Sequence, residues 1–288
     1  MKMAQLLEGK VVAAAVIEDL KRRIAKLKEQ GVVPGLATIL VGDDSASAGY
    51  VRKKHEACEA IGIKSFHKHI DKNSKQSDLM ATVKEFNDNP EIHGYIIQYP
   101  VPEQFDFAEA MSQMKPEKDA DGLHPNNLGK LVLQEKGPIP ATPAGIKEML
   151  IHYNIPTDGR EVVVVGRGTT LGRPLALLLS EKAKGANAAV TVVHSAVKDI
   201  SYYTKRADIL IAAVGRPSII MPDMVKKDAV VISGGISWKG KRLLADVDES
   251  VGEVASWITP RLGGVGPTTI AMLLRNTVEA AERAAAKN

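Results

Sequence analysis

The sequence predicts an α/β protein made of two α/β domains with a cleft between them. Short apolar runs rich in β-branched residues alternate with longer helical patterns along most of the chain. An alternation of this kind implies mostly parallel sheets with helices on both faces. The length of 288 residues suits roughly two domains of about 150 residues each.

The first half of the chain opens on a predicted helix. Residues 11–30 form an amphipathic pattern, and Gly31 stands where helices commonly end. Ser45 or Ser47 is expected to cap a later helix that ends near Gly62. The other predicted elements of this half are strands over 36–41, 63–70 and 95–98, and helices over 77–87 and 105–114.

A stretch rich in Pro, Gly and Asp, residues 115–143, marks the expected boundary between the domains. A helix over 144–153 is expected to bridge them. The first domain then comprises residues 1–140, joined by a C-terminal helix over 268–288 that packs back on it, and residues 141–267 form the second domain.

The second domain has the pattern of a Rossmann-type dinucleotide-binding fold. Between a valine-rich strand and a helix lies a glycine-rich loop that contains Gly166, Gly168 and Gly172. Such glycines permit a tight turn and bring backbone N–H groups close to a pyrophosphate at a helix N-terminus. An ordinary strand-to-helix turn is the alternative. The predicted elements are strands over 161–165, 189–194, 209–214 and 229–232, and a helix over 173–184.

The end of the second strand of this domain indicates the cofactor. An NAD site usually places an acid there to accept from the ribose 2′-hydroxyl. Here the strand ends in His194-Ser195, and Arg167 and Arg173 lie in and just after the glycine-rich loop. A cation without a competing carboxylate favours NADP over NAD.

Composition limits the classes of function. The net charge of +4 gives no case for a nucleic-acid-binding protein. Cys58 is the one cysteine, so no intrachain disulfide forms, which fits the cytoplasm; the residue is expected in the core. No apolar segment approaches the ~20 residues that span a membrane, so no membrane association is expected.

Tyr50 and Lys54 stand about one helical turn apart, so both project from one helix face. Short-chain dehydrogenases use the same spacing, but after their nucleotide loop, and here the pair comes before it. One interpretation is a substrate site in which the Tyr50 ring packs on a flat ligand and Lys54 handles protons. The other is a surface lysine on an exposed helix beside Arg52 and Lys53.

Three further segments carry polar or glycine residues at sites suited to ligands. Gln98 ends an apolar strand, where parallel sheets line ligand crevices, although simple strand termination is the alternative. Asp119 and Asp121 place two carboxylates in one turn. Gly264 and Pro267 precede the last helix in a stretch that suits either close ligand approach or a hinge. The histidines are scattered, so no metal site is expected.

The order of these motifs resembles the bifunctional methylenetetrahydrofolate dehydrogenase/methenyltetrahydrofolate cyclohydrolase family nearly end to end. Several matching segments in one order are far more specific than any single motif. The segments are VGDDSAS (41–47) with YVRKK (50–54), GYIIQYPVP (94–102), KDADGLHP (118–125), ATPAG (141–145) and ITPRLGGVGPTT (258–269).

The resemblance implies two reactions at one site. A hydride passes from 5,10-methylenetetrahydrofolate to NADP, and water then opens the methenyl product to 10-formyltetrahydrofolate. For catalysis, the resemblance implies that Lys54 handles protons and that Gln98 controls this lysine. For folate binding, it implies that Tyr50 stacks on the folate, that Asp121 binds the pterin, and that Gly264 and Pro267 line the cleft. The implied nucleotide contacts are Arg167, Gly168, Ser195 and Ile236. A homodimer through the nucleotide domains is also implied.

This chain departs from the usual family pattern at four places. Gly168 stands where many members have Ser, and Ala141 replaces a common Cys. Ser233-Gly234 replaces Asp-Val, and Arg261-Leu262 replaces Val-Pro. None of these changes removes a residue assigned to the chemistry. An enzyme with only one of the two activities, or a non-catalytic nucleotide-binding paralogue, are the remaining alternatives.

Overall fold

The computed structural model describes residues 3–240 and 242–286, which divide into two compact units. The three-stranded unit comprises residues 15–141 and 270–286, and the six-stranded unit comprises residues 3–14 and 142–269. The boundaries between the units lie inside helices α1 (Gly9–Glu29) and α9 (Val265–Ala285) and at the start of α6 (Ala141–His152).

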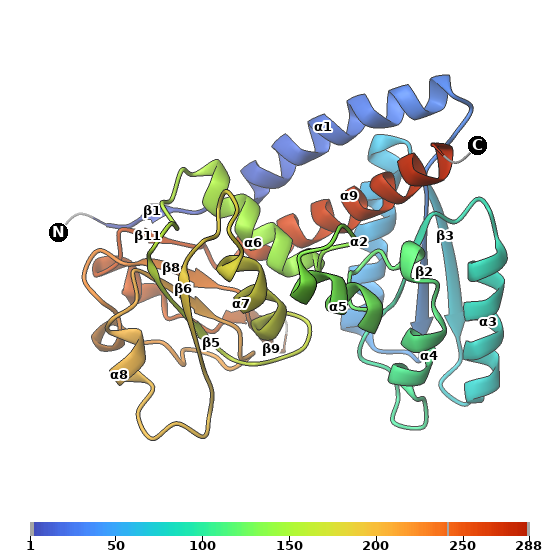
Figure 1. The fold of residues 1–288 in the computed structure, drawn as a ribbon. Helices are drawn as coiled ribbons and strands as arrows, with labels where there is room; N and C mark the ends of the chain where they lie inside the picture. Colours follow the sequence, from blue (N-terminus) through green and yellow to red (C-terminus); the bar gives the residue numbers. More distant parts are fainter. Residues whose placement is uncertain (1–2, 241, 287–288) are drawn as a thin grey trace. The chain divides into compact units, whose positions relative to one another are not determined.

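The three-stranded unit contains a parallel sheet in the order β3-β2-β4. Along β2, Ala37, Ile39 and Val41 pack with the apolar face of α3, whereas Thr38 points to His55 of α2. Successive strand residues face opposite sides, so α2 and α3 cover the two faces (Figure 1). The elements are β2 (Gly35–Val41), β3 (Lys64–Ile70), β4 (Gly94–Ile97), α2 (Ser45–Ile61), α3 (Gln76–Asp88), α4 (Phe107–Gln113), η1 (Pro116–Lys118) and α5 (Pro125–Leu133).

The six-stranded unit is a doubly wound parallel sheet in the order β1-β11-β8-β7-β5-β6. Val162 and Val164 of β5 join one core with α6 and α7, while Val163 and Val165 join another core on the opposite face. The elements are β1 (Gln5–Leu6), β5 (Glu161–Val165), α7 (Gly172–Ser180), β6 (Ala189–Val193), α8 (Ser201–Thr204), β7 (Ile209–Ala212), η2 (Pro222–Met224), β8 (Val230–Ser233), η3 (Glu249–Glu253) and β11 (Trp257–Ile258).

The strand order of this unit reverses at β5, because β6 lies on one side of it and β7 on the other. In open α/β sheets, the carboxyl ends of the strands at such a switch point form the ligand crevice. The loop after β5 is the glycine-rich loop. A separate antiparallel hairpin of β9 (Ile236–Lys239) and β10 (Arg242–Ala245) follows β8.

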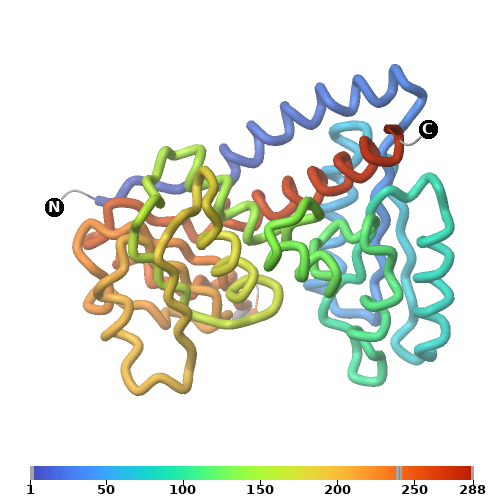
Figure 2. The backbone as a smooth tube through the Cα atoms, viewed as in Figure 1, coloured from blue at the N-terminus to red at the C-terminus, as the bar shows by residue number. Residues whose placement is uncertain are grey.

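Residues 3–14 lie with the six-stranded unit, whereas the sequence-based division placed residues 1–140 together. β1 pairs with β11 in parallel, so the N-terminal segment extends the larger sheet (Figure 2). Residues 270–285 of α9 belong to the three-stranded unit, and α6 after its first residue belongs to the six-stranded unit. The end of the predicted C-terminal helix, residues 287–288, lies outside the described residues.

Three local expectations were wrong. Asp44, not Ser45 or Ser47, is the N-cap of α2, because its carboxylate accepts from the Ser47 N–H at 2.7 Å. The stretch 115–143 contains a helix that was not predicted, since Pro125 opens α5 and His124 caps it by accepting from the Asn126 N–H. The helix predicted over 173–184 ends at Ser180, where Glu181 becomes extended.

None of the described helices combines the length and apolarity needed to cross a membrane.

Candidate active site

Helix α2 places Tyr50 and Lys54 on one face. The helix ends at Gly62, whose left-handed φ of 81° is favourable for glycine, as predicted. Tyr50 is half-buried, and burial raises the pKa of its phenol. Lys53 lies over the Tyr50 ring at 5.9 Å from the centroid. One side of the ring therefore contacts a cation.

Lys54 is a buried amine. Only 8% of the residue is exposed, and Nζ donates to Oε1 of Gln98 at 3.0 Å. Burial lowers the pKa of Lys54, and the nearby carboxylate of Asp121 opposes that shift. The interpretation of Lys54 as an exposed surface lysine is therefore wrong, and the amine is suited to exchange protons.

Gln98 lies directly after β4 and presents its side chain to Lys54. Its backbone N–H donates to the Ile39 carbonyl at 2.8 Å, which continues the sheet by one residue. Its side-chain Nε2 donates to the Tyr99 carbonyl at 2.8 Å. With the amide nitrogen occupied in this way, Oε1 is left to accept from the lysine.

Asp121 completes the polar group around Lys54. Burial raises the pKa of Asp121, the Lys54 ammonium lowers it, and neighbouring Asp119 raises it. The next residue, Gly122, has φ of +73°, and a Cβ there would lie 2.4 Å from the Ile139 carbonyl carbon. Only glycine fits this turn, so the position of Asp121 is closely defined.

Asp119 supports the turn that carries Asp121. Its buried carboxylate accepts from the N–H groups of Gly122 at 2.9 Å and His124 at 2.7 Å, and from Nδ2 of Asn127 at 2.9 Å. All its donors are neutral and belong to the same segment. Asp119 is therefore structural, whereas its neighbour Asp121 is left with its carboxylate near Lys54.

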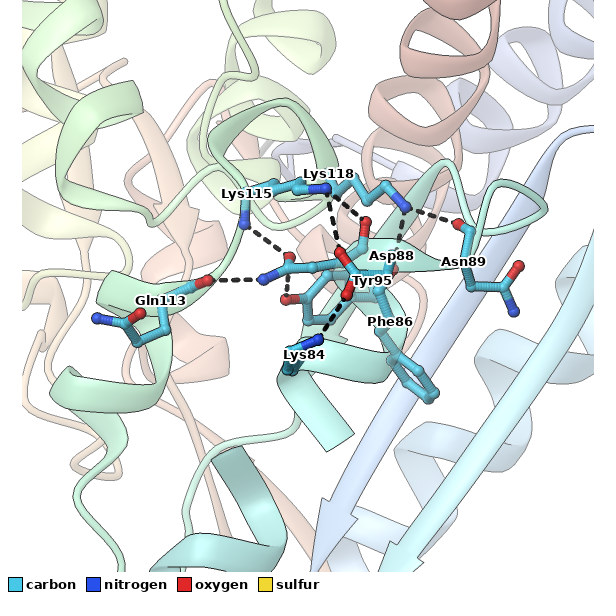
Figure 3. Close-up of polar contacts among 9 residues, drawn as sticks. Lys84, Phe86, Asp88, Asn89, Tyr95, Gln113, Lys115 and Lys118 are labelled. Atoms are coloured by element: carbon cyan, nitrogen blue, oxygen red, sulfur yellow. Dashed lines mark hydrogen bonds and ion pairs between the residues drawn. The ribbon is translucent and has the colours of Figure 1, made fainter. Parts of the chain in front are cut away.

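The segment before this turn is tied to the end of α3, a connection that sequence reasoning missed (Figure 3). Lys118 Nζ donates to the carbonyls of Phe86 at 3.0 Å and Asn89 at 2.7 Å. Burial and the neighbouring Lys115 lower the pKa of Lys118 to about 8. The hydroxyl of Tyr95 donates to Oδ1 of Asn87, which also accepts from the Lys115 N–H. Cations near the last carbonyls of a helix stabilise it.

Asn276 of α9 is a second support that the sequence did not reveal. Its Nδ2 donates to the carbonyls of Ala120 at 2.8 Å and Ile139 at 2.9 Å. Ala120 directly precedes Asp121, and the Ile139 backbone lies against Gly122. An asparagine in a long apolar helix is the signal that points to such a contact, because a buried amide requires partners.

The glycine-rich loop after β5 has the geometry that its sequence predicts. Gly166 has φ of +120°, and a Cβ there would lie 2.2 Å from the Ala213 carbonyl oxygen. A Cβ on Gly172 would lie 2.3 Å from the Gly166 carbonyl oxygen. At Gly168, in contrast, no atom lies within 4 Å of the position that a Cβ would occupy, and φ is not in the left-handed region. The first and last glycines are therefore required by the turn, and the middle one is not.

The N-terminus of α7 faces this turn. Leu171 is its N-cap and offers no side-chain acceptor. The Arg173 N–H donates to the Gly168 carbonyl at 3.1 Å, and Pro174 has no N–H. Of the first three residues of the helix, Gly172 is therefore the one whose N–H is suited to an anion at the loop. Arg167 and Arg173 are exposed beside it, and Ser195 is exposed after the end of β6. Ile236 begins β9 and is 38% exposed. The strand β6 is followed by His194-Ser195 without a carboxylate.

Gly264 and Pro267 lie in the six-stranded unit, apart in the chain from the group around Lys54. A Cβ on Gly9 would lie 1.8 Å from the Gly264 carbonyl oxygen, and Lys10 N–H donates to the Gly263 carbonyl at 3.1 Å. Pro267 is the third residue of α9, within its first turn. Arg261 is held by Oε1 of Glu249 at 3.0 Å and by the Leu243 carbonyl.

A Rossmann-like unit with a glycine-rich loop at the start of a helix, together with a second α/β unit that buries an amine, defines a nucleotide-dependent enzyme. Two family models match the chain: the catalytic domain of tetrahydrofolate dehydrogenase/cyclohydrolase at residues 7–121 and its NAD(P)-binding domain at residues 140–285. The chain belongs to the tetrahydrofolate dehydrogenase/cyclohydrolase family.

Relatives in sequence and in structure cover nearly the whole chain. The chain is 67% identical to the bifunctional protein FolD of Syntrophotalea carbinolica over 282 residues, 98% of this chain and 97% of that protein. The crystal structure of the bifunctional FolD enzyme from Campylobacter jejuni has a TM-score of 0.93 at 40% identity, over 98% and 99% of the two chains. FolD from Trypanosoma brucei, complexed with NADP and an inhibitor, has a TM-score of 0.93 at 36% identity, over 99% of each chain.

Proposed function

We propose that this chain oxidises 5,10-methylenetetrahydrofolate with NADP and hydrolyses the methenyl product to 10-formyltetrahydrofolate. Family membership supports both reactions, and the observation that carries the assignment of residues is the buried Lys54 amine in contact with Gln98 and close to Asp121. We assign hydrolysis and most of folate binding to the three-stranded unit, and nucleotide binding to the six-stranded unit.

In the hydrolytic step, water adds to the methenyl carbon and must lose a proton as the new C–O bond forms. Burial lowers the pKa of Lys54 from its usual value, which favours its role as the group that accepts that proton. Gln98 Oε1 directs the amine, and the ammonium that forms keeps this acceptor and the Asp121 carboxylate as partners. As the C–N bond breaks, the ring nitrogen takes a proton from the Lys54 ammonium. The hydroxyl of the adduct loses its proton to water as the formyl C=O forms, so one proton is released overall.

Folate binding is the proposed task of Tyr50, Asp121, Gly264 and Pro267. A half-buried aromatic face suits a flat pterin. The carboxylate of Asp121 offers two acceptors to the amino-pyrimidine edge, which presents two donors. Gly264 permits the backbone to approach the ligand closely, and Pro267 fixes the start of the helix.

NADP is the proposed nucleotide, held by Gly166, Arg167, Gly168, Ser195 and Ile236. The loop 166–172 receives the pyrophosphate at the start of α7, and exposed Arg167 supplies a cation for the 2′-phosphate. The space beside Gly168 has room for the serine found in many family members. The nucleotide supplies the hydride acceptor, and these residues bind and orient it.

The direct test is a spectrophotometric assay with methylenetetrahydrofolate and either NADP or NAD. We expect kcat/KM to be about tenfold to a hundredfold higher with NADP, since contacts to a charged phosphate contribute roughly 1.5–3 kcal/mol. Decay of methenyltetrahydrofolate, followed separately without nucleotide, measures the hydrolysis. Higher efficiency with NAD would refute the cofactor assignment, and absence of either reaction would refute the dual function.

A cytoplasmic homodimer is also part of the proposal, and the open edge of the larger sheet supports the dimer. β6 pairs only with β5 among the described strands, is free of charge and proline, and exposes 38% of Val192. An apolar edge strand of this kind favours pairing with a second copy. The single cysteine Cys58 is free and buried, as predicted, which suits a reducing compartment.

Val192→Lys is expected to convert the dimer to a monomer. A two-fold axis brings the new ammonium groups of both copies to one interface, and like charges in close contact cost several kcal/mol. We expect the dissociation constant of the dimer to rise by about a hundredfold or more. Sedimentation or light scattering over a range of protein concentrations measures it. Met221→Lys, a change at another exposed apolar residue of the same unit, is the control. A monomeric wild type or a dimeric variant would contradict the proposal.

A further inference from the structure

Asp246 is a buried acid that directly follows β10 and that the proposed function does not use. Its side chain is fully buried, and Oδ2 accepts from the backbone N–H groups of Val214 at 2.7 Å and Gly215 at 3.0 Å. These residues form the loop after β7. The carboxylate therefore occupies a concave group of N–H donors that elsewhere binds phosphates.

The other side of the carboxylate is closed by the residues after β8. A Cβ on Gly235 would lie 2.0 Å from Oδ2, so only glycine leaves room for the acid. Ser233 Oγ accepts from the Asp246 N–H at 3.0 Å, and the Ser233 N–H donates to Thr259 Oγ1 at 2.8 Å. Ser233, which replaces the usual Asp of the family, therefore connects the end of β8 to Asp246.

This acid lies at the edge of the sheet that carries the nucleotide loop. The Ala213 carbonyl oxygen fills the space above Gly166, so the loop after β7 and the glycine-rich loop are in contact. The position of a Cβ on Gly215 lies 3.7 Å from the Ile236 carbonyl oxygen. Asp246 thus joins the loop after β7 to the turn that leads into Ile236, next to the topological switch point.

Stability alone gives no reason for a carboxylate at this position. Oδ1 of Asp246 is buried and has no hydrogen-bond partner among the described residues, which costs free energy. Burial also raises the pKa of Asp246, against the effect of the N–H groups of the loop. Buried groups that reduce stability in this way commonly serve function.

We infer that Asp246 is a positioning residue for dehydrogenation, which holds the Val214-Gly215 loop and Ile236 in the arrangement that orients the nicotinamide end of the nucleotide. The inference rests on the proposed function. Because the internal carboxylate occupies the N–H groups of Val214 and Gly215, the phosphates of the nucleotide bind at the glycine-rich loop instead. Loss of the carboxylate should therefore disturb hydride transfer more than nucleotide affinity.

Asp246→Asn tests this inference, because the two reactions of one chain have different requirements. The variant keeps one acceptor oxygen and loses the charge that strengthens both hydrogen bonds. We expect kcat for NADPH formation to fall about tenfold and KM for NADP to change less than about threefold. Hydrolysis of methenyltetrahydrofolate, which needs no nucleotide, should stay within about twofold of the wild type.

Asp223→Asn is the matched control, since it makes the same charge change at an exposed residue of the same unit and should leave both reactions unchanged. Gly235→Ala is the second variant, because its methyl group displaces the Asp246 carboxylate, and it should give the same selective loss. Equal loss of both reactions, or no loss of dehydrogenation, would overturn the inference. A wild type without NADPH formation would instead refute the proposed function.

Discussion

Lys54→Met is expected to abolish hydrolysis of methenyltetrahydrofolate without unfolding the protein. Methionine keeps the unbranched apolar stem at this buried position and removes the amine that accepts the proton of the attacking water. Loss of a general acid–base group typically lowers a rate by 10²–10⁴-fold, so we expect about a thousandfold loss of kcat. The measurement is the decay of methenyltetrahydrofolate without nucleotide, corrected for its spontaneous hydrolysis.

Stability separates loss of chemistry from loss of structure in this variant. Burial of the Lys54 ammonium costs free energy, whereas its removal leaves the buried Asp121 carboxylate without its counter-charge. The two effects oppose each other, so Tm should change little. Gln98 is only half-buried, and its Oε1 can accept from water instead. Lys68→Met, at an exposed position of the same unit, is the matched control. Hydrolysis at the wild-type rate by Lys54→Met would remove Lys54 from the mechanism.

The long helices and the buried strands were predictable from sequence because each buries a continuous apolar pattern. The strand over 161–165 and the end of α2 at Gly62 follow such local signals. α5 was missed because it is short and begins at a proline inside a stretch rich in turn residues. The N-cap of α2 shows the same limit: Asp44, Ser45 and Ser47 are all good caps, and only the backbone conformation selects the aspartate.

The residues of the site were predictable as types but not as contacts. The spacing of Tyr50 and Lys54 places them on one helix face, yet it does not reveal whether that face is buried. Burial of Lys54 depends on Gln98, which directly follows β4, and on the turn at Asp121; these residues lie 44 and 67 residues away in the chain. Asp246 was missed because its role arises from the ends of three elements, none adjacent in sequence.

Asp121→Asn is expected to weaken folate binding strongly in both reactions. The carboxylate offers two acceptors, whereas the amide offers one acceptor and presents a donor to a donor on the ligand. Such a mismatch costs roughly 3–4 kcal/mol, so we expect KM for the folate to rise by about a hundredfold to a thousandfold. The affinity of Asp121→Asn for NADP, measured by titration without folate, should not change. The control is Asp88→Asn, a change at an exposed acid, which should have the kinetics of the wild type.

The same variant also tests the electrostatic coupling between Asp121 and Lys54. The Asp121 anion raises the pKa of Lys54 against the effect of burial. Without the anion, Lys54 loses its proton at a lower pH, so the midpoint of the hydrolysis profile that depends on Lys54 should move to lower pH at saturating folate. An unchanged midpoint together with an unchanged KM would show that Asp121 neither binds the folate nor acts on the amine. A shifted midpoint with normal KM would keep the coupling and reassign the pterin contact to another residue.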